Sequence, residues 1–225
     1  MPITLYHLEA SPPSRTALLS AKLVGVDVNV KIVDLFTGKH LEPEFLKMNP
    51  LHTVPVLDDD GFIVSDSQAI ACYLTNKYSK DDKLYPKDPK KRAVVDQRLY
   101  FAATVLFPRL RNITYPVFFE GATSVSEDKK AQVLEALKIL DGYLAPTGWV
   151  AGDNLTIADI ACLTNVSTYP GMGFDLAPYK NVSAWLDRCR KQVPSYQEVN
   201  QVGVDILRKG FESCLHRGEK GDPKK

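Results

Sequence analysis

The N-terminal part of the chain alternates between short segments with strand periodicity and a longer segment with helical periodicity. Residues 3–8 are rich in β-branched and aromatic side chains, which predicts a strand. Apolar residues recur at helical spacing over residues 12–24, and Gly25 ends that helix. Residues 26–33 alternate between apolar and polar side chains and predict a second strand. Because such strand–helix–strand units cross over right-handed, we expect the two strands to be parallel.

Turn-forming residues divide the next part of the chain into short elements. The run of three aspartates and Gly61 at residues 58–61 is typical of a hairpin turn between two strands. The predicted elements around it are a short helix, the two strands and a longer helix, at residues 44–49, 54–57, 62–64 and 67–78.

A polar segment ending in proline, at residues 79–86, marks a change of pattern. After it the long segments all have helical periodicity, at residues 89–119, 127–145, 156–170, 181–193 and 196–215. The predicted fold class is an α/β thioredoxin-like N-terminal domain plus an all-α C-terminal domain. The expected divisions are a first domain, a linker, a helical domain and a disordered tail, at residues 1–79, 80–88, 89–215 and 216–225.

Composition and charge exclude several classes of protein. The 225 residues carry 28 Lys and Arg against 27 Asp and Glu, so no basic excess indicates nucleic-acid binding. No apolar run is long enough to predict a membrane span, and the N-terminus lacks the pattern of a secretory signal. The four cysteines show neither metal-ligand nor disulfide-framework spacing. We therefore expect a cytoplasmic protein that binds no metal, nucleic acid or membrane.

The turn between the first predicted strand and helix carries the clearest candidate chemistry. A thioredoxin-like redox protein has Cys-x-x-Cys here, whereas this chain has Ser11 and Ser14 at that spacing. Disulfide exchange is therefore excluded. The helix N-terminus still favours an anion such as a thiolate, because its first N–H groups are unpaired and its dipole end is positive. A hydroxyl at this place can donate a hydrogen bond to the sulfur of another molecule.

A second local signal predicts structure rather than catalysis. Thr156 is followed three residues later by Asp159, so each side chain can bind the backbone N–H of the other residue. This capping box predicts the start of a helix.

Several motifs in the same order resemble those of a cytosolic glutathione transferase, in particular the insect epsilon class, with the delta class as near neighbour. They are Ser-Pro-Pro-x-Arg, Asn-Pro-x-His-Thr-Val-Pro-Val-Leu, Ser-Asp-Ser-x-Ala-Ile, Leu-Tyr-Pro-Lys-Asp and the Thr156–Asp159 cap. The likeness covers the chain up to about residue 210. It implies a glutathione transferase fold, glutathione as co-substrate and a homodimer.

The resemblance makes Ser11 the residue that activates the thiol. A hydrogen bond from its hydroxyl would favour the thiolate and lower the pKa of the sulfur. The other interpretation of Ser11 is a helix N-cap before two prolines. Tyr6 is a rival, because other branches of the family use a tyrosine from the first strand, but a position on the sheet face suits it better. His7 has less support.

The implied glutathione site draws on the loops that follow the first helix. In the family the bond before Pro55 is cis, which turns the N–H and C=O of Val54 toward the tripeptide. Ser67 would hold the γ-glutamyl carboxylate, and Asp66 its ammonium. Simple capping of a helix and solvated loop histidines are the alternatives. The expected glutathione-binding residues are His40, His52, Val54, Pro55, Asp66, Ser67 and Arg111.

The second substrate needs an apolar wall beside the sulfur. Aromatic residues recur at helical spacing over residues 107–119, a pattern that a packed core also explains. Pro108 should kink that helix or shift its hydrogen bonding, which affects the path of Arg109 and Arg111. The expected hydrophobic-substrate residues are Leu35, Phe107, Leu110, Thr114, Phe118 and Phe119.

The predicted function is conjugation of the glutathione thiolate to hydrophobic electrophiles, as in detoxification. The same thiolate could serve peroxide reduction or dehydrohalogenation. The alternative is a non-catalytic carrier of glutathione or apolar ligands on the same fold.

Overall fold

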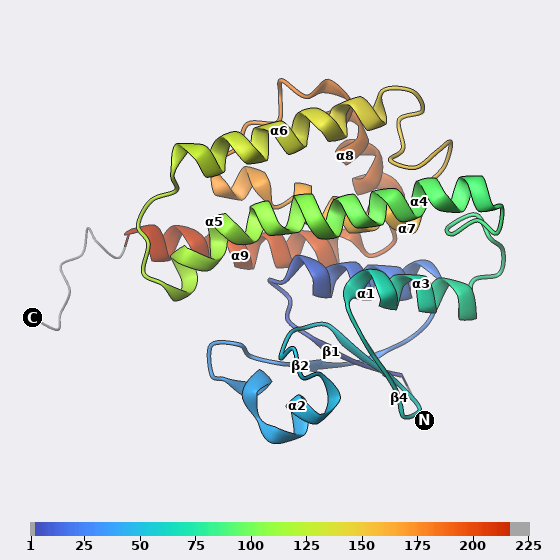
Figure 1. Ribbon diagram of the computed structural model, residues 1–225, viewed down its shortest axis with the longest axis horizontal. Coiled ribbons are helices and arrows are strands. Elements are labelled where there is room, and N and C mark those ends of the chain that lie inside the picture. The colour runs from blue at the N-terminus through green and yellow to red at the C-terminus, as the bar shows by residue number, and fades with distance from the viewer. Residues whose placement is uncertain (1–2, 217–225) are drawn as a thin grey trace, which may run out of the picture.

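A computed structural model describes residues 3–216 (Figure 1). The expected tail therefore lies outside the described residues except for His216. The first half of the fold is a four-stranded sheet in the order β2-β1-β3-β4. Strands β1 (Thr4–His7) and β2 (Asn29–Ile32) are parallel, and β3 (Val56–Asp59) and β4 (Phe62–Ser65) are antiparallel neighbours on the other side of β1. The predicted parallel pair is confirmed.

Helices cover the sheet on both faces (Figure 1). On the side of the helical domain lie α1 (Pro12–Leu23) and α3 (Ser67–Tyr78), and α2 (Pro43–Met48) lies on the opposite side. A short 3-10 turn, η1 (Lys39–Leu41), precedes α2. Leu5 and Leu57 from the sheet pack against Ala17 of α1 and Ile70 of α3, so alternate strand residues face the two helices.

Two predicted strands are shorter or shifted in the structure, each for a local reason. The N–H of Val26 donates to the carbonyl of Ala21 at the end of α1, next to Gly25 with its positive φ of 72°, so the chain is still turning there. Strand β3 begins at Val56 and not at residue 54, since Pro55 has no N–H for the ladder.

The second half is helical, and no helix or strand lies between Tyr78 and Pro89. In chain order its elements are α4 (Pro89–Phe101), the π-helical segment η2 (Ala102–Leu106), α5 (Phe107–Phe119), α6 (Glu127–Leu144), α7 (Ile157–Val166), the 3-10 turn η3 (Tyr169–Met172), α8 (Lys180–Gln192), the π-helical segment η4 (Tyr196–Gln201) and α9 (Val202–Leu215). Helix α7 is completely buried and packs against α1 and α4. Within residues 3–216, no helix is long and apolar enough to cross a membrane.

The expected helix over residues 89–119 is continuous but contains a wide turn before Pro108. In η2 the N–H of Phe107 donates to the carbonyl of Ala102, five residues back. Proline cannot donate and crowds the carbonyl four residues before it, so the wider turn makes room for the ring. The predicted shift in hydrogen bonding is confirmed.

The capping box predicted at the start of α7 is present. The carboxylate of Asp159 accepts hydrogen bonds from the N–H of Thr156 at 2.9 Å, the N–H of Val150 at 2.9 Å and the indole N–H of Trp185 at 3.0 Å. The side chain is fully buried, so these donors replace the water that the carboxylate has lost. The box therefore anchors the loop before α7 and helix α8 as well.

Candidate functional site

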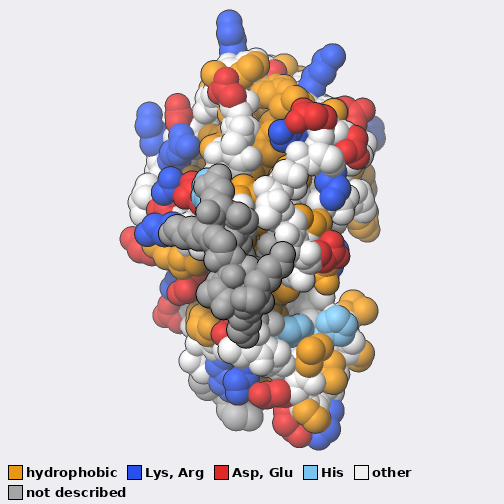
Figure 2. All heavy atoms as spheres, turned by 90° about the vertical axis from the view of Figure 1, so that its left-hand side faces the viewer, with side chains coloured by type: hydrophobic (Ala, Val, Ile, Leu, Met, Phe, Trp, Pro, Cys, Tyr) orange, Lys and Arg blue, Asp and Glu red, His pale blue; other side chains and the backbone are white. Residues whose placement is uncertain are grey.

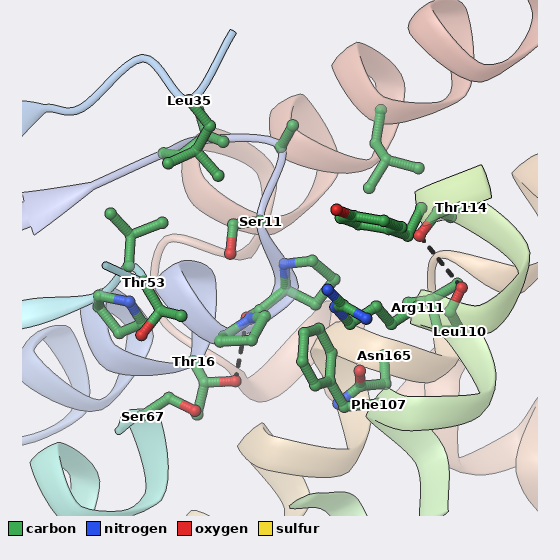
Figure 3. A pocket seen from close by; sticks show the side chains of 18 of the residues that line it. Ser11, Thr16, Leu35, Thr53, Ser67, Phe107, Leu110, Arg111, Thr114 and Asn165 are labelled. Atoms are coloured by element: carbon green, nitrogen blue, oxygen red, sulfur yellow. Dashed lines mark hydrogen bonds between the residues drawn. The ribbon is translucent and has the colours of Figure 1, made fainter. Parts of the chain in front are cut away.

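A cavity of about 710 Å³ lies between the sheet domain and the helical domain. Its walls come from the β1–α1 turn, the loops after β2 and α2, the start of α3, and helices α5, α7 and α9 (Figure 3). On the side of the molecule shown in Figure 2, histidine and hydrophobic side chains lie together below the helical domain. The cavity is lined by all of the expected site residues, namely Ser11, Leu35, His40, His52, Val54, Pro55, Asp66, Ser67, Phe107, Leu110, Arg111, Thr114, Phe118 and Phe119.

Ser11 caps helix α1 and faces the cavity (Figure 3). Its Oγ accepts a hydrogen bond from the N–H of Ser14 at 3.4 Å. The hydroxyl of Ser14 is buried and accepts from the N–H of Leu8 at 3.3 Å, which ties the turn to the strand. Because the cap uses a lone pair of Ser11 Oγ and not its proton, capping and donation to a ligand are compatible. The two interpretations of Ser11 do not compete.

Tyr6 and His7 lie outside the residues that line the cavity. Tyr6 packs edge to face against Phe45 of α2 on the opposite side of the sheet, with the ring centroids 6.1 Å apart. His7 is buried at 2% exposure. The sheet-face position expected for Tyr6 is confirmed.

The Val54–Pro55 peptide bond is cis, as the resemblance implied. The backbone N–H and C=O of Val54 make no hydrogen bond within residues 3–216, although Val54 is buried at 8% exposure. Unpaired backbone groups at a buried position are available to a peptide-like ligand.

At the start of α3, Asp66 has a strained backbone, and its carboxylate accepts two hydrogen bonds from backbone N–H groups. Asp66 has a φ of 71°, and its Oδ1 accepts from the N–H of Gln68 at 2.9 Å and of Ala69 at 3.1 Å. Asp66 is thus the N-cap of the helix. The hydroxyl of Ser67 donates to Oε1 of Gln68 at 2.8 Å. Both Ser67 and Gln68 line the cavity.

Two histidine side chains, His40 of η1 and His52 of the loop after α2, lie near one another in the cavity lining. The ring centroids of His40 and His52 are 6.0 Å apart. His52 has a positive φ of 47°, an uncommon conformation for a residue with a Cβ. Burial, and then the charge that His52 can carry, lower the pKa of His40. A bound carboxylate would offset both effects, because it favours the protonated imidazole.

The two arginines of α5 point to different places. Arg109 forms an ion pair with Glu135 of α6 at 2.8 Å. The guanidinium of Arg111 lies 4.2 Å above the ring of Tyr115 and lines the cavity. No carboxylate pairs with Arg111 in the described part of the chain. Arg111 therefore lies on the cavity side of α5, whereas Arg109 pairs with α6.

The apolar wall is formed mainly by α5 and by the loop after β2. Phe36 is 64% exposed, and its ring stacks on that of Phe119 with a centroid distance of 5.2 Å and an interplanar angle of 16°. The hydroxyl of Thr114 donates to the carbonyl of Leu110 at 3.1 Å, so the wall is less polar than its sequence indicates. The two domains meet across this aromatic contact.

Some residues of the cavity wall were not predicted from the sequence. They include Thr16 of α1, Gln68 of α3, Asn165 of α7 and three residues of α9, Ile206, Leu207 and Gly210. Only the amphipathic pattern of the last helix could have drawn attention to α9 before its position was known.

The fold defines a two-domain protein with a thioredoxin-like sheet domain and a helical domain. The cavity between the two domains has polar groups in one part of its lining and apolar groups in another. Residues 10–77 match the family described as "Glutathione S-transferase, N-terminal domain", and residues 77–192 match "Glutathione S-transferase, C-terminal domain". The chain therefore belongs to the glutathione S-transferase family of enzymes.

Individual relatives agree with this assignment. The chain is 44% identical to "Glutathione S-transferase 1" of Manduca sexta over 92% of its own length and 96% of that protein. A delta-class glutathione transferase of Nilaparvata lugens has a TM-score of 0.91 and 47% identity, covering 95% of this chain and 100% of that one. An epsilon-class enzyme of the housefly, Musca domestica, has a TM-score of 0.91 and 42% identity, covering 94% and 98%. The resemblance to these two insect classes is confirmed.

Proposed function

We propose that this protein conjugates the thiolate of glutathione to electrophilic carbons of apolar compounds, with Ser11 as the catalytic hydroxyl. The observation that carries the proposal is the hydrogen bond from the N–H of Ser14 to Ser11 Oγ. It occupies a lone pair of the oxygen and leaves the hydroxyl proton for a sulfur at the N-terminus of α1. Donation to the sulfur favours its ionised form, which is the nucleophile.

The polar end of the cavity supplies groups for each part of the tripeptide. The unpaired backbone of Val54 suits the cysteinyl residue, as an added strand would. Asp66 and Ser67 at the start of α3 suit the γ-glutamyl ammonium and carboxylate. His40 and His52, with Arg111, supply positive charge for the remaining carboxylate.

The reaction then requires that the sulfur of glutathione and the electrophilic carbon of the second substrate lie next to one another. The sulfur forms a bond to the electrophilic carbon as the leaving group departs with its electron pair, or as the electrons of a double bond shift to an acceptor. The apolar wall of α5, with Leu35 and Phe36, holds the second substrate beside Ser11. Positioning and charge stabilisation supply the rate acceleration, without a covalent enzyme intermediate.

Replacing Ser11 with alanine tests the proposal. Ser11→Ala should lower turnover with 1-chloro-2,4-dinitrobenzene at least tenfold while glutathione binds within about threefold of wild type. Ser20→Ala is the matched control, because the hydroxyl of Ser20 lies in the same helix but is buried and donates to the carbonyl of Thr16. Equal turnover in Ser11→Ala and wild type would remove Ser11 from the mechanism. Binding of glutathione without turnover of any electrophile would favour a carrier.

We also propose a homodimer located in the cytosol. Large apolar side chains are exposed on the α4 and β4 side, with Phe62 at 52%, Val94 at 39% and Tyr100 at 69%. Burial of these side chains against a second copy would be favourable. The four cysteines are not joined by disulfides, which agrees with a reducing compartment. Sedimentation of the purified protein tests the dimer, and a monomer at micromolar concentration would contradict it.

A further inference from the structure

Among the cavity-lining polar groups that the proposed mechanism does not use, the side-chain amide of Asn165 has an atom without a hydrogen-bond partner. Asn165 lies on α7, lines the cavity and is 3% exposed. Its Nδ2 donates to the carbonyl of Ala161 at 2.8 Å. Its Oδ1 is buried and has no hydrogen-bond partner within residues 3–216.

The hydrogen bond to Ala161 fixes which way the amide points. If the nitrogen and oxygen were exchanged, Oδ1 would face the carbonyl oxygen of Ala161 and both would lack a proton. The acceptor is therefore directed away from the backbone of α7. Figure 3 shows Asn165 among the residues that line the cavity, together with Phe107 and Arg111 of α5.

A buried acceptor without a partner has lost its hydrogen bonds to water and gained none in return. A ligand that brings an O–H or N–H group to this oxygen regains them. Apolar side chains such as Leu110 and Leu207 belong to the same cavity lining and offer the ligand no hydrogen-bond partner of their own. The positive guanidinium of Arg111 lies in the same cavity and disfavours an ammonium ion, so the donor is a neutral group.

We propose that Asn165 Oδ1 is an acceptor subsite for a neutral hydroxyl or N–H group of the second substrate. The enzyme then selects apolar electrophiles that carry such a donor over equally apolar ones that lack it. This specificity rests on the proposed function, because the second substrate is the one that the transferase reaction requires. Since Oδ1 is buried, a donor reaches it when a cavity-lining side chain changes rotamer, a common adjustment on binding.

The test compares two ligands of the same apolar shape, 4-tert-butylphenol and 4-tert-butylanisole, in which a methyl group replaces the hydroxyl proton. Their dissociation constants are measured by calorimetry on the protein saturated with S-methylglutathione. The variants are Asn165→Leu and, as control, Asn112→Leu, since Asn112 is exposed on α5 and does not line the cavity.

Wild type and Asn112→Leu should bind the phenol about tenfold more tightly than its methyl ether. In Asn165→Leu the ratio should fall to about twofold or less, through weaker binding of the phenol alone. The same ratio in wild type and Asn165→Leu would overturn the subsite. Equal binding of the two ligands by wild type would also overturn it and would mean that a water molecule satisfies Oδ1.

Two precautions keep the outcome decisive. If Asn165→Leu does not fold, Asn165→Ala replaces it, and the wild-type ratio decides independently of any variant. Calorimetry needs no turnover, so an enzyme without conjugating activity would contradict the proposed function and leave the binding result unaffected.

Discussion

The Nη1 atom of Arg15 lies 2.7 Å from Oδ1 of Asn200, and this contact joins the first helix of the sheet domain to the segment before α9. Arg15 is fully buried. Its Nη2 donates to Thr168 Oγ1 at 2.8 Å and to the carbonyl of Thr164 at 3.1 Å, both from the α7 region. These acceptors are all neutral. Burial lowers the pKa of the guanidinium to about 9, so the group stays charged at neutral pH.

Removing the amide of Asn200 should therefore weaken the whole protein. Asn200→Leu leaves the buried guanidinium short of acceptors, and we expect the free energy of unfolding to fall by about 2–3 kcal/mol. Urea denaturation measures it. Gln201→Leu is the control, because Gln201 is only half-buried and bonds Asp205. An equal fall in the free energy of unfolding of the two variants would show that the contact with Arg15 does not stabilise the protein.

Gly203 is required for the close approach of α9 to α1. A Cβ at this position would lie 2.2 Å from the carbonyl oxygen of Glu9 and 2.4 Å from Cδ of Arg15. Gly203→Ala should lower stability by more than about 2 kcal/mol, since the backbone itself must move. Gly142→Ala in α6 is the opposite case, because that Cβ would meet nothing within 4 Å. It should raise stability by about 0.5–1 kcal/mol, and thermal unfolding of both variants checks the difference in sign.

Acid should destabilise the protein through His7. Burial, and then the charge on Arg15, lower the pKa of His7 from 6.5 to about 4. As pH falls from 6.5 to 4 the unfolded chain binds a proton at this residue and the folded protein does not, so stability is lost in this window. The loss is at most about 3 kcal/mol. His7→Gln should flatten the stability curve between these pH values, and a curve parallel to that of wild type would contradict the assignment.

Phe36 should affect the second substrate and not glutathione. Its exposed ring stacks on Phe119 of α5, in the apolar part of the cavity lining. Phe36→Ala should raise KM for an apolar electrophile about three- to tenfold and leave KM for glutathione unchanged. Ile139→Ala, which truncates an exposed apolar residue of α6 outside the cavity, should change neither value. An equal rise in both KM values would show that Phe36 acts by holding the structure of its loop and not by contact with the second substrate.

Much of the fold could be predicted from the sequence because its signals are local. The capping box at Thr156, the helical periodicity and the turn before Phe62 need only neighbouring residues. Asn165 could not be found this way. Every residue of α7 is buried, so its pattern distinguishes no face, and an amide in such a helix gives no sign of the cavity it reaches. The buried contact of Arg15 with Asn200 joins residues that are far apart in the chain.

The wide turn at η2 sets the rotation of everything that follows it on the same helix. An α-helix advances by about 100° per residue, so one residue accommodated in a π turn offsets α5 relative to α4 by roughly that angle. Phe107 and Arg111, which line the cavity, follow this turn on α5. Helix α4 and the apolar wall of α5 therefore belong to one continuous helix although they are offset in rotation. Insertion or loss of one residue within Ala102–Leu106 would change this offset, and with it the set of α5 residues that form the wall.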